Sequence, residues 1–158
     1  MEKKIAIFPG SFDPFTKGHA HIVEKALDLF DEVVIFVASN PNKKRMFEVR
    51  AIGAMLETKY EELEKEGRIH VCTMPNTLVA EVAKIYHVKY IVKGIRNATD
   101  ADYELSQADA NKWLGGLQTV LIPCDKEYSH ISSTLVRSLL NVTGEHSEEA
   151  RLKANELM

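Results

Sequence analysis

Residues 5–19 read IAIFPGSFDPFTKGH, and this stretch decides the fold class. Its first four residues form a short apolar run without alternation, which is typical of a strand buried on both faces of a sheet. Glycine and proline then mark a turn, and residues 18–30 follow with an apolar stripe at helical spacing. A strand, a loop and a helix in this order predict the first unit of a parallel α/β sheet.

The same alternation continues along the chain. Further short apolar runs lie at residues 33–37, 69–72, 90–92 and 119–122. Helical patterns follow at residues 55–63, 78–86, 102–114 and 132–140. This order predicts a Rossmann-like, doubly wound sheet of five parallel strands with helices on both faces. Ligands of such folds bind beyond the carboxyl ends of the strands, so the loops after the strands are the candidate sites.

Length and composition predict an ordinary single domain. The chain has 158 residues, of which 45% are hydrophobic and 27% are charged, so residues 1–158 are expected to form one core. The segment from about residue 141 to residue 158 is rich in charged residues and is expected to form a helical extension. A net charge of −3 argues against nucleic acid or a membrane surface as a partner.

The cysteines and the start of the chain bear on the compartment. Cys72 and Cys124 lie far apart without a CxxC pair, which indicates neither a disulfide framework nor a zinc site. Free thiols are typical of a reducing cytosol. The apolar run after the opening MEKK is too short for a signal peptide or a membrane span. We therefore expect a soluble, cytoplasmic protein.

The loop after the first strand has the features of a phosphate site. Free backbone N–H groups at a helix start attract anions, and the helix dipole adds to this attraction. Gly18 lets a phosphate approach the backbone closely, and His19 can donate Nε2–H to a phosphoryl oxygen. A helix capped by Ser11 or Thr16 with an exposed His19 has the same pattern, so this loop alone leaves both interpretations open. We interpret His21 as structural.

A second loop, residues 39–45, reads SNPNKKR. Its three successive cations, Lys43, Lys44 and Arg45, can hold a phosphate as point charges. A solvated basic turn is the alternative, and it is favoured when the loop is taken alone.

The fourth strand ends in a third candidate loop. Lys93 and Arg96 flank Gly94 there and face a run of acidic residues at the next helix start. This arrangement suits a polyphosphate with its Mg²⁺, or a contact to a sugar or a base. For Asp100 and Asp102 we favour a simpler role, the stabilisation of that helix start through its dipole.

The last loop, residues 126–137, reads KEYSHISSTLVR. Ser132, Ser133 and Thr134 open a helix, and three hydroxyls in a row exceed what one helix cap needs. Arg137 lies one turn inside the helix, whereas His130 is interpreted as a packing residue. The chain has no nucleophile paired with a base and no histidine spacing for a metal. Loops that share donors, cations and one histidine favour phosphoryl or nucleotidyl transfer, in which positioning and charge neutralisation dominate.

Taken together, TKGH at residues 16–19 and ISSTLVR at residues 131–137 resemble the two motifs of the (T/H)xGH nucleotidylyltransferases. The chain is most similar to the bacterial phosphopantetheine adenylyltransferases, from residue 4 to about residue 140, through PGSFDPFTKGH, NPNKKRMF, VKGIRNATDADYE and EYSHISST. The resemblance implies a reaction in which ATP and 4′-phosphopantetheine give dephospho-coenzyme A and pyrophosphate with Mg²⁺. It also implies a homohexamer.

The resemblance further implies roles for individual residues. The catalytic residues would be His19, Lys43 and Arg96, with His19 stabilising charge on the transferring phosphate. Phosphopantetheine would be bound by Ser11, Lys43, Val79 and Lys93. The implied ATP site comprises Ser11, Phe12, His19, Gly94, Ile95, Arg96, Glu104, Tyr128, Ser129, His130, Ile131, Ser132, Ser133 and Thr134.

Four departures from the family pattern stand out. Lys93 replaces a usual arginine and keeps the charge without the bidentate fork. Ala101 and His130 stand where aromatic residues are common, and the segment after Phe47 is about two residues short. Because both nucleotide motifs are intact, we expect an active enzyme that works by direct in-line attack without a covalent intermediate.

Other functions remain as alternatives. One is a sister nucleotidylyltransferase that uses another phosphorylated acceptor, such as nicotinate mononucleotide or glycerol 3-phosphate. Another is a non-catalytic nucleotide-binding module. A dinucleotide-dependent oxidoreductase is disfavoured because the chain lacks GxGxxG and an acidic ribose partner.

Overall fold

The computed structural model describes all 158 residues and contains one five-stranded sheet. The strands are β1 (Ile5–Gly10), β2 (Glu32–Val37), β3 (Ile69–Cys72), β4 (Tyr90–Ile95) and β5 (Gln118–Pro123). Every neighbouring pair is parallel, and the order is β3-β2-β1-β4-β5. The predicted doubly wound parallel sheet is confirmed. Strand order reverses between β1 and β4, so the loops after these two strands open a crevice.

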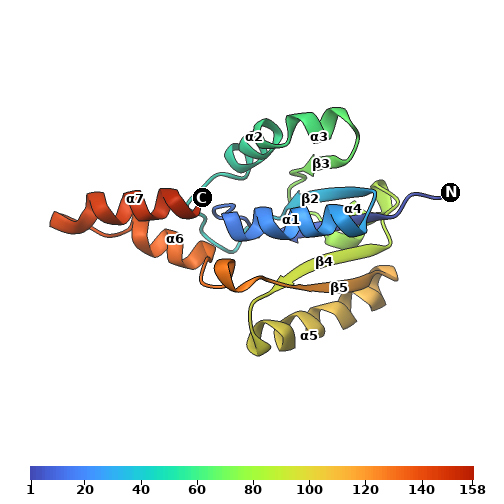
Figure 1. Cartoon of the computed structure of the whole chain (residues 1–158). Helices are drawn as coiled ribbons and strands as arrows, with labels where there is room; N and C mark the ends of the chain where they lie inside the picture. Colours follow the sequence, from blue (N-terminus) through green and yellow to red (C-terminus); the bar gives the residue numbers. More distant parts are fainter.

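Helices cover both faces of the sheet (Figure 1). The α-helices are α1 (Lys17–Leu29), α2 (Val49–Lys59), α3 (Glu61–Lys65), α4 (Val79–Ile85), α5 (Ala98–Gly115), α6 (Ser133–Leu140) and α7 (Ser147–Leu157). Two short 3₁₀ turns, η1 (Lys126–Tyr128) and η2 (Gly144–His146), precede α6 and α7. Helices α1 and α2 pack on one face, and α4 packs on the other with α5 beside it.

The interior strand β2 shows why the apolar runs lack alternation. Val33 and Ile35 belong to the core beneath α1 and α2, whereas Val34 and Phe36 belong to the core beneath α4. All four side chains are fully buried. Since successive side chains point to opposite faces, a strand covered on both faces needs an apolar residue at every position.

Two predicted helices differ from the observed ones. The helix expected at residues 55–63 begins at Val49 and breaks at Tyr60, where the backbone leaves the helical region (φ −108°, ψ 20°) and the ring is buried. The helix expected at residues 102–114 begins at Ala98, because the Asn97 side chain caps it by accepting from the Asp100 amide. This helix, α5, buries no residue within the chain, so its apolar positions are not part of the core.

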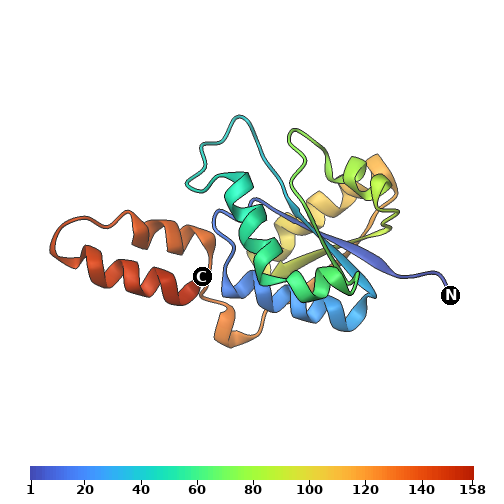
Figure 2. The same ribbon diagram turned by 90° about the horizontal axis from the view of Figure 1, so that it is seen from above.

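The end of the chain forms a helical hairpin that projects from the sheet (Figures 1 and 2). Helix α7 packs along α6, where Ala150 and Ala154 are buried. Small side chains at these positions let the two helices approach closely. No helix of the structure combines the length and the apolar composition needed to cross a membrane.

Candidate active site

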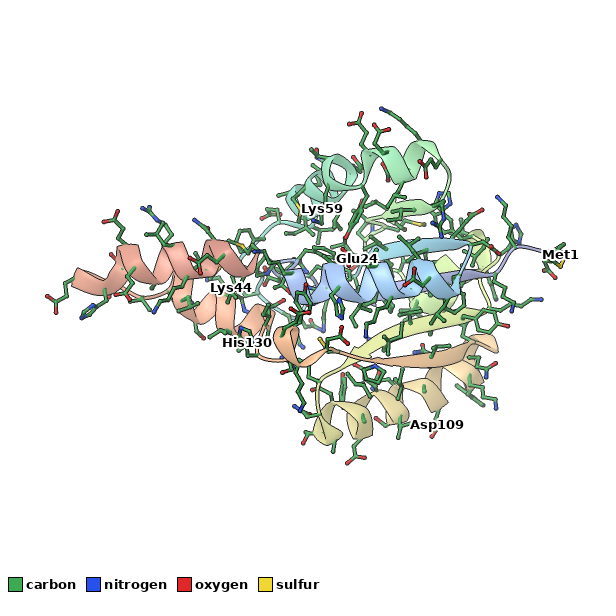
Figure 3. All side chains as sticks on the ribbon, viewed as in Figure 1. Met1, Glu24, Lys44, Lys59, Asp109 and His130 are labelled. Carbon is green, nitrogen blue, oxygen red and sulfur yellow. The ribbon has the colours of Figure 1, made fainter.

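A cavity of about 360 Å³ lies where β1 and β4 end. Its walls come from the loop after β1, the first turn of α1, the end of β4, the start of α5 and the start of α6. Lys44 and His130 mark this end of the molecule in Figure 3, and Met1 lies at the opposite end. The cavity therefore occupies the crevice that the strand order creates.

His19 is held in the wall of this cavity by the cap of α1. Thr16 is the N-cap, and its hydroxyl accepts from the His19 backbone N–H at 3.4 Å. In return, the Thr16 backbone N–H donates to His19 Nδ1 at 2.9 Å. Because a backbone N–H can only donate, Nδ1 is the acceptor and the ring proton lies on Nε2. Nε2 makes no hydrogen bond within the chain and is available to a ligand.

Aromatic rings surround His19. The ring centroids of Phe12, Phe15 and Phe8 lie 4.9, 5.3 and 6.3 Å from that of His19. Phe12 adopts a left-handed backbone conformation (φ 46°) that turns its ring into this group. Burial among these rings, reinforced by the positive charge of Arg96, lowers the pKa of His19 to about 4. His19 is therefore neutral near pH 7 and offers an N–H donor without a charge.

The two cations at the end of β4 are paired with carboxylates of α5. Lys93 Nζ lies 3.4 Å from Glu104 Oε2, and both side chains are largely buried. Arg96 donates to Asp100 Oδ2 from its Nε at 3.0 Å and from its backbone N–H at 3.1 Å. Asp100 therefore does more than stabilise the start of α5: it orients Arg96. All four residues line the cavity.

The start of α6 closes the cavity from the other end of the sequence. Ser132 caps α6 by accepting from the Leu135 N–H at 3.0 Å, whereas Ser133 donates its hydroxyl proton to the Pro14 carbonyl at 2.7 Å. Arg137 donates to the Asp13 carbonyl at 2.7 Å. The second motif therefore binds the loop that carries the first one.

A second cavity, of about 300 Å³, adjoins the first. It is lined by Ser11, Asp13, Ala38, Ser39, Asn40, Lys43, Lys44, Arg45 and Arg137. Ser11 and Arg137 line both cavities, so the two spaces meet at these residues. Lys43 faces the second cavity, whereas His19 and Arg96 face the first.

Most of the predicted site residues come together in these two cavities. Those that line the first are Ser11, Phe12, His19, Lys93, Gly94, Arg96, Glu104, Ile131, Ser132, Ser133 and Thr134. Five others lie outside the walls of both: Val79, Ile95, Tyr128, Ser129 and His130.

Tyr128 has a packing partner instead. Its ring stacks on His21 with centroids 4.3 Å apart and an interplanar angle of 19°. Asp125 holds the same group together, because its carboxylate lies 3.1 Å from His21 Nε2 and 2.6 Å from Lys25 Nζ. The structural interpretation of His21 agrees with this arrangement.

Sequence reasoning missed the residues that hold the loops in place. The buried Asp13 carboxylate accepts from the backbone N–H groups of Met46 and Phe47, at 3.0 and 2.7 Å. Arg45, one of three cations in a loop that is either a phosphate site or a solvated basic turn, donates to backbone carbonyls. A lone aspartate before proline is an ordinary turn signal, so the sequence held no sign of this role.

Comparison with known proteins places the chain in a family. Residues 7–139 match the Cytidylyltransferase-like family. The phosphopantetheine adenylyltransferase of Latilactobacillus sakei is 41% identical over 146 residues, which cover 92% of this chain and 87% of that protein. The phosphopantetheine adenylyltransferase of Cytophaga hutchinsonii is 42% identical over 145 residues, covering 91% and 94%.

Solved structures share the fold at lower identity. The Plasmodium falciparum nicotinic acid mononucleotide adenylyltransferase, complexed with NaAD, aligns with a TM-score of 0.62 at 16% identity and covers 98% of this chain and 94% of its own. The bifunctional NMN adenylyltransferase/ADP ribose pyrophosphatase of Francisella tularensis aligns with a TM-score of 0.61 at 19% identity, covering 92% and 44%. Since relatives at about 40% identity match nearly the whole length, the chain belongs to the phosphopantetheine adenylyltransferases of the cytidylyltransferase-like family.

Proposed function

We propose that this protein transfers the adenylyl group of ATP to 4′-phosphopantetheine and releases dephospho-coenzyme A and pyrophosphate. The observation that carries the proposal is the meeting of two cation-lined cavities at Ser11 and Arg137. A transfer between two anionic substrates needs two such spaces with a shared wall, where the acceptor phosphate can approach the α-phosphorus. The relatives' name supplies the identity of the acceptor.

The chain's own residues act by positioning and by charge. ATP occupies the first cavity, with its phosphates near the α1 and α6 starts, where free backbone N–H groups point outward. The acceptor phosphate enters the second cavity, where Lys43 and Lys44 offset its charge. It is already anionic near neutral pH, so its attack on the α-phosphorus needs no strong base. The proposed attack is direct and in line, without a covalent enzyme intermediate.

His19 serves the transition state through Nε2–H. A neutral donor is suited to a site already crowded with cations, since it adds a hydrogen bond to a phosphoryl oxygen without repelling Arg96. The cap of α1 fixes the donor before substrate arrives, so no reorganisation is needed at the moment of reaction.

Magnesium enters this proposal as part of the nucleotide substrate. No group of three or more histidine, cysteine or acidic side chains is arranged to hold a metal ion. The nearest carboxylates, Asp100 and Glu104, are already paired with Arg96 and Lys93. Mg²⁺ keeps water ligands and binds readily through phosphate oxygens, so the ATP phosphates would hold it there and it would offset their charge.

Pyrophosphate release tests the function. Purified protein is incubated with ATP and Mg²⁺ in four parallel reactions. Three contain one acceptor each, namely 4′-phosphopantetheine, nicotinate mononucleotide or glycerol 3-phosphate, and the fourth contains no acceptor. Pyrophosphate should appear with 4′-phosphopantetheine alone. Pyrophosphate release with another acceptor would identify a sister enzyme. ATP binding without pyrophosphate release in the presence of any acceptor would identify a non-catalytic module.

We also propose that the protein is a homohexamer in the cytoplasm. Support for assembly comes from α5, which exposes Tyr103, Leu105, Trp113 and Leu114 and buries no residue within the chain. Support for a reducing compartment comes from the two cysteines, which are both free.

A further inference from the structure

Arg45 donates to a backbone carbonyl from each of its three guanidinium nitrogens. Its Nη2 donates to the Ser11 carbonyl at 2.7 Å, its Nε to the Phe47 carbonyl at 2.9 Å, and its Nη1 to the Ala38 carbonyl at 3.4 Å. Each nitrogen has a different acceptor. Three of its five N–H donors are used in this way, which fixes the position of the side chain against three backbone segments.

Two of the three carbonyls lie just beyond the ends of β1 and β2, and the third lies in the loop that carries Arg45. The last pair of the β1–β2 ladder is Gly10 with Val37, and Ser11 and Ala38 are the next residues on each strand. One further backbone bond, from the Ala38 N–H to the Gly10 carbonyl at 2.8 Å, ends the ladder. Arg45 therefore joins the two strand ends just where the sheet stops holding them, and ties both to its own loop.

Asp13 strengthens the same connection from the other side. Its carboxylate is buried and accepts from the backbone N–H groups of Met46 and Phe47. Residues 45–47 are therefore anchored by Arg45 and Asp13 to the loop that follows β1.

The tip of the loop has no such anchor. Within residues 39–44 the hydrogen bonds are local, from Asn42 N–H to Asn40 Oδ1 and from Lys43 N–H to the Asn40 carbonyl. The side chains of Lys43 and Lys44 make no hydrogen bond or ion pair and line the second cavity. The positions of Lys43 and Lys44 therefore depend on the anchored residues 45–47 that follow them in the chain.

We propose that Arg45 is a positioning residue for the acceptor substrate. By joining the ends of β1 and β2 to its own loop, it sets the distance from Lys43 to Ser11, and so the approach of the acceptor phosphate to the nucleotide. The inference rests on the proposed function, because it assigns the acceptor, 4′-phosphopantetheine, to the second cavity.

The test compares full-length wild type with three variants. R45M removes the anchor, and R45K keeps the charge but cannot reach three carbonyls with one ammonium group. R50M is the matched control: it removes the same side chain from the exposed first turn of α2, where Arg50 makes no hydrogen bond or ion pair. For each protein, kcat and the KM values for the acceptor and for ATP are measured. Amide hydrogen exchange is followed on the same proteins without ligand.

R45M and R45K should both raise the acceptor KM by about tenfold or more and leave the ATP KM within about twofold, whereas R50M should match wild type. Exchange of the Met46 and Phe47 amides should accelerate in both Arg45 variants, because these amides donate to Asp13 and lose protection when residues 45–47 separate from the loop after β1. If R45M does not fold, R45K carries the same expectation.

Two results overturn the inference. Recovery of the wild-type acceptor KM in R45K would mean that the charge of residue 45 acts on the phosphate. Unchanged amide exchange in a folded Arg45 variant, or equal rises in both KM values, would mean that no anchor for the acceptor was lost. Failure of the proposed function is seen separately, as absence of pyrophosphate release by wild type.

Discussion

At the scale of single residues, the cap of α1 fixes the orientation of His19, the proposed catalytic donor. Thr16 occupies Nδ1 with a backbone N–H, which leaves Nε2–H as the only donor of the ring. Phe12 and Phe15 cover the ring and keep it neutral. The third helical residue of such a capping box is usually Glu or Gln, whose side chain only accepts from the N-cap backbone. His19 accepts there through Nδ1 and still has the Nε2–H group to donate to a ligand.

Replacing His19 by alanine should lower kcat by about 10²–10³-fold, as for the loss of an oxyanion-hole donor, with a much smaller effect on the ATP KM. Steady-state pyrophosphate release measures both constants. His21→Ala is the control, because His21 stacks on Tyr128 outside the cavity. A near-normal kcat in His19→Ala would remove the role assigned to His19.

The lowered pKa of His19 also predicts a dependence of stability on pH. The folded value is about 4 and the ordinary value is 6.5, so between these limits the unfolded chain binds a proton that the folded chain does not. Stability from this residue is complete above pH 6.5 and is lost as the pH falls toward 4. The loss should be on the order of 1–3 kcal/mol.

Urea unfolding of wild type and His19→Gln, at about pH 7 and about pH 4.5, checks this prediction. The carboxylates are the same in both proteins, so their contribution cancels in the comparison. The wild type should lose more stability than the variant on acidification. Parallel losses would show that His19 titrates at its ordinary pKa.

At the scale of elements, the glycines of α1 and β4 have different tasks. A Cβ at Gly94 would lie 2.8 Å from Ile22 Cγ1, so glycine there lets α1 pack against β4. A Cβ at Gly18 would meet nothing closer than 3.4 Å, so packing does not require glycine at the start of α1. Gly18 lines the cavity, and its missing side chain leaves room for the ligand.

Gly94→Ala should therefore cost about 1–3 kcal/mol of unfolding free energy through overpacking. Gly18→Ala should leave stability unchanged or raise it by up to about 1 kcal/mol, because alanine is favoured over glycine in a helix, and should weaken ATP binding. Urea unfolding and calorimetric ATP titration separate the two effects. Destabilisation by Gly18→Ala of the same size as by Gly94→Ala would contradict this division.

The sequence predicted elements well where one burial pattern governs them. Strand β2 is apolar from Val33 to Val37 because it is covered on both faces, and the predicted run differs from the observed strand only at Glu32. Helix α5 was misplaced at its start because its boundary depends on the Asn97 cap rather than on periodicity. Tyr60 ends α2 through its burial among distant residues, which no local pattern reports.

For the site, the sequence predicted chemistry better than contacts. The resemblance named His19 and Ser132, which line the first cavity. It also named Tyr128, which packs on His21, and the run of cations hid the difference between Lys43 and Arg45. Which cation binds carbonyls is decided by the positions of strand ends far away in the sequence, and these exist only after folding.

At the scale of the whole molecule, the exposed helix α5 offers a way to distinguish the monomer from the proposed hexamer. Trp113 is 85% exposed in the single chain and is the only tryptophan. If subunits meet over α5, its fluorescence emission should shift to shorter wavelength as protein concentration rises. Mass photometry should show hexamers over the same range. A monomer with unshifted emission at working concentrations would refute both the hexamer and this interface.

The closure of the first cavity by α6 has a consequence for how the protein is made. Strands β1 to β4 and the residues around His19 leave the ribosome first, whereas Ser132, Ser133 and Arg137 emerge near the end of synthesis. Because the sheet adds β5 only at its edge, most of the core can form on the nascent chain. The first cavity cannot form until α6 is present. A chain that ends before residue 132 lacks Ser132, Ser133 and Arg137, and with them one wall of the cavity.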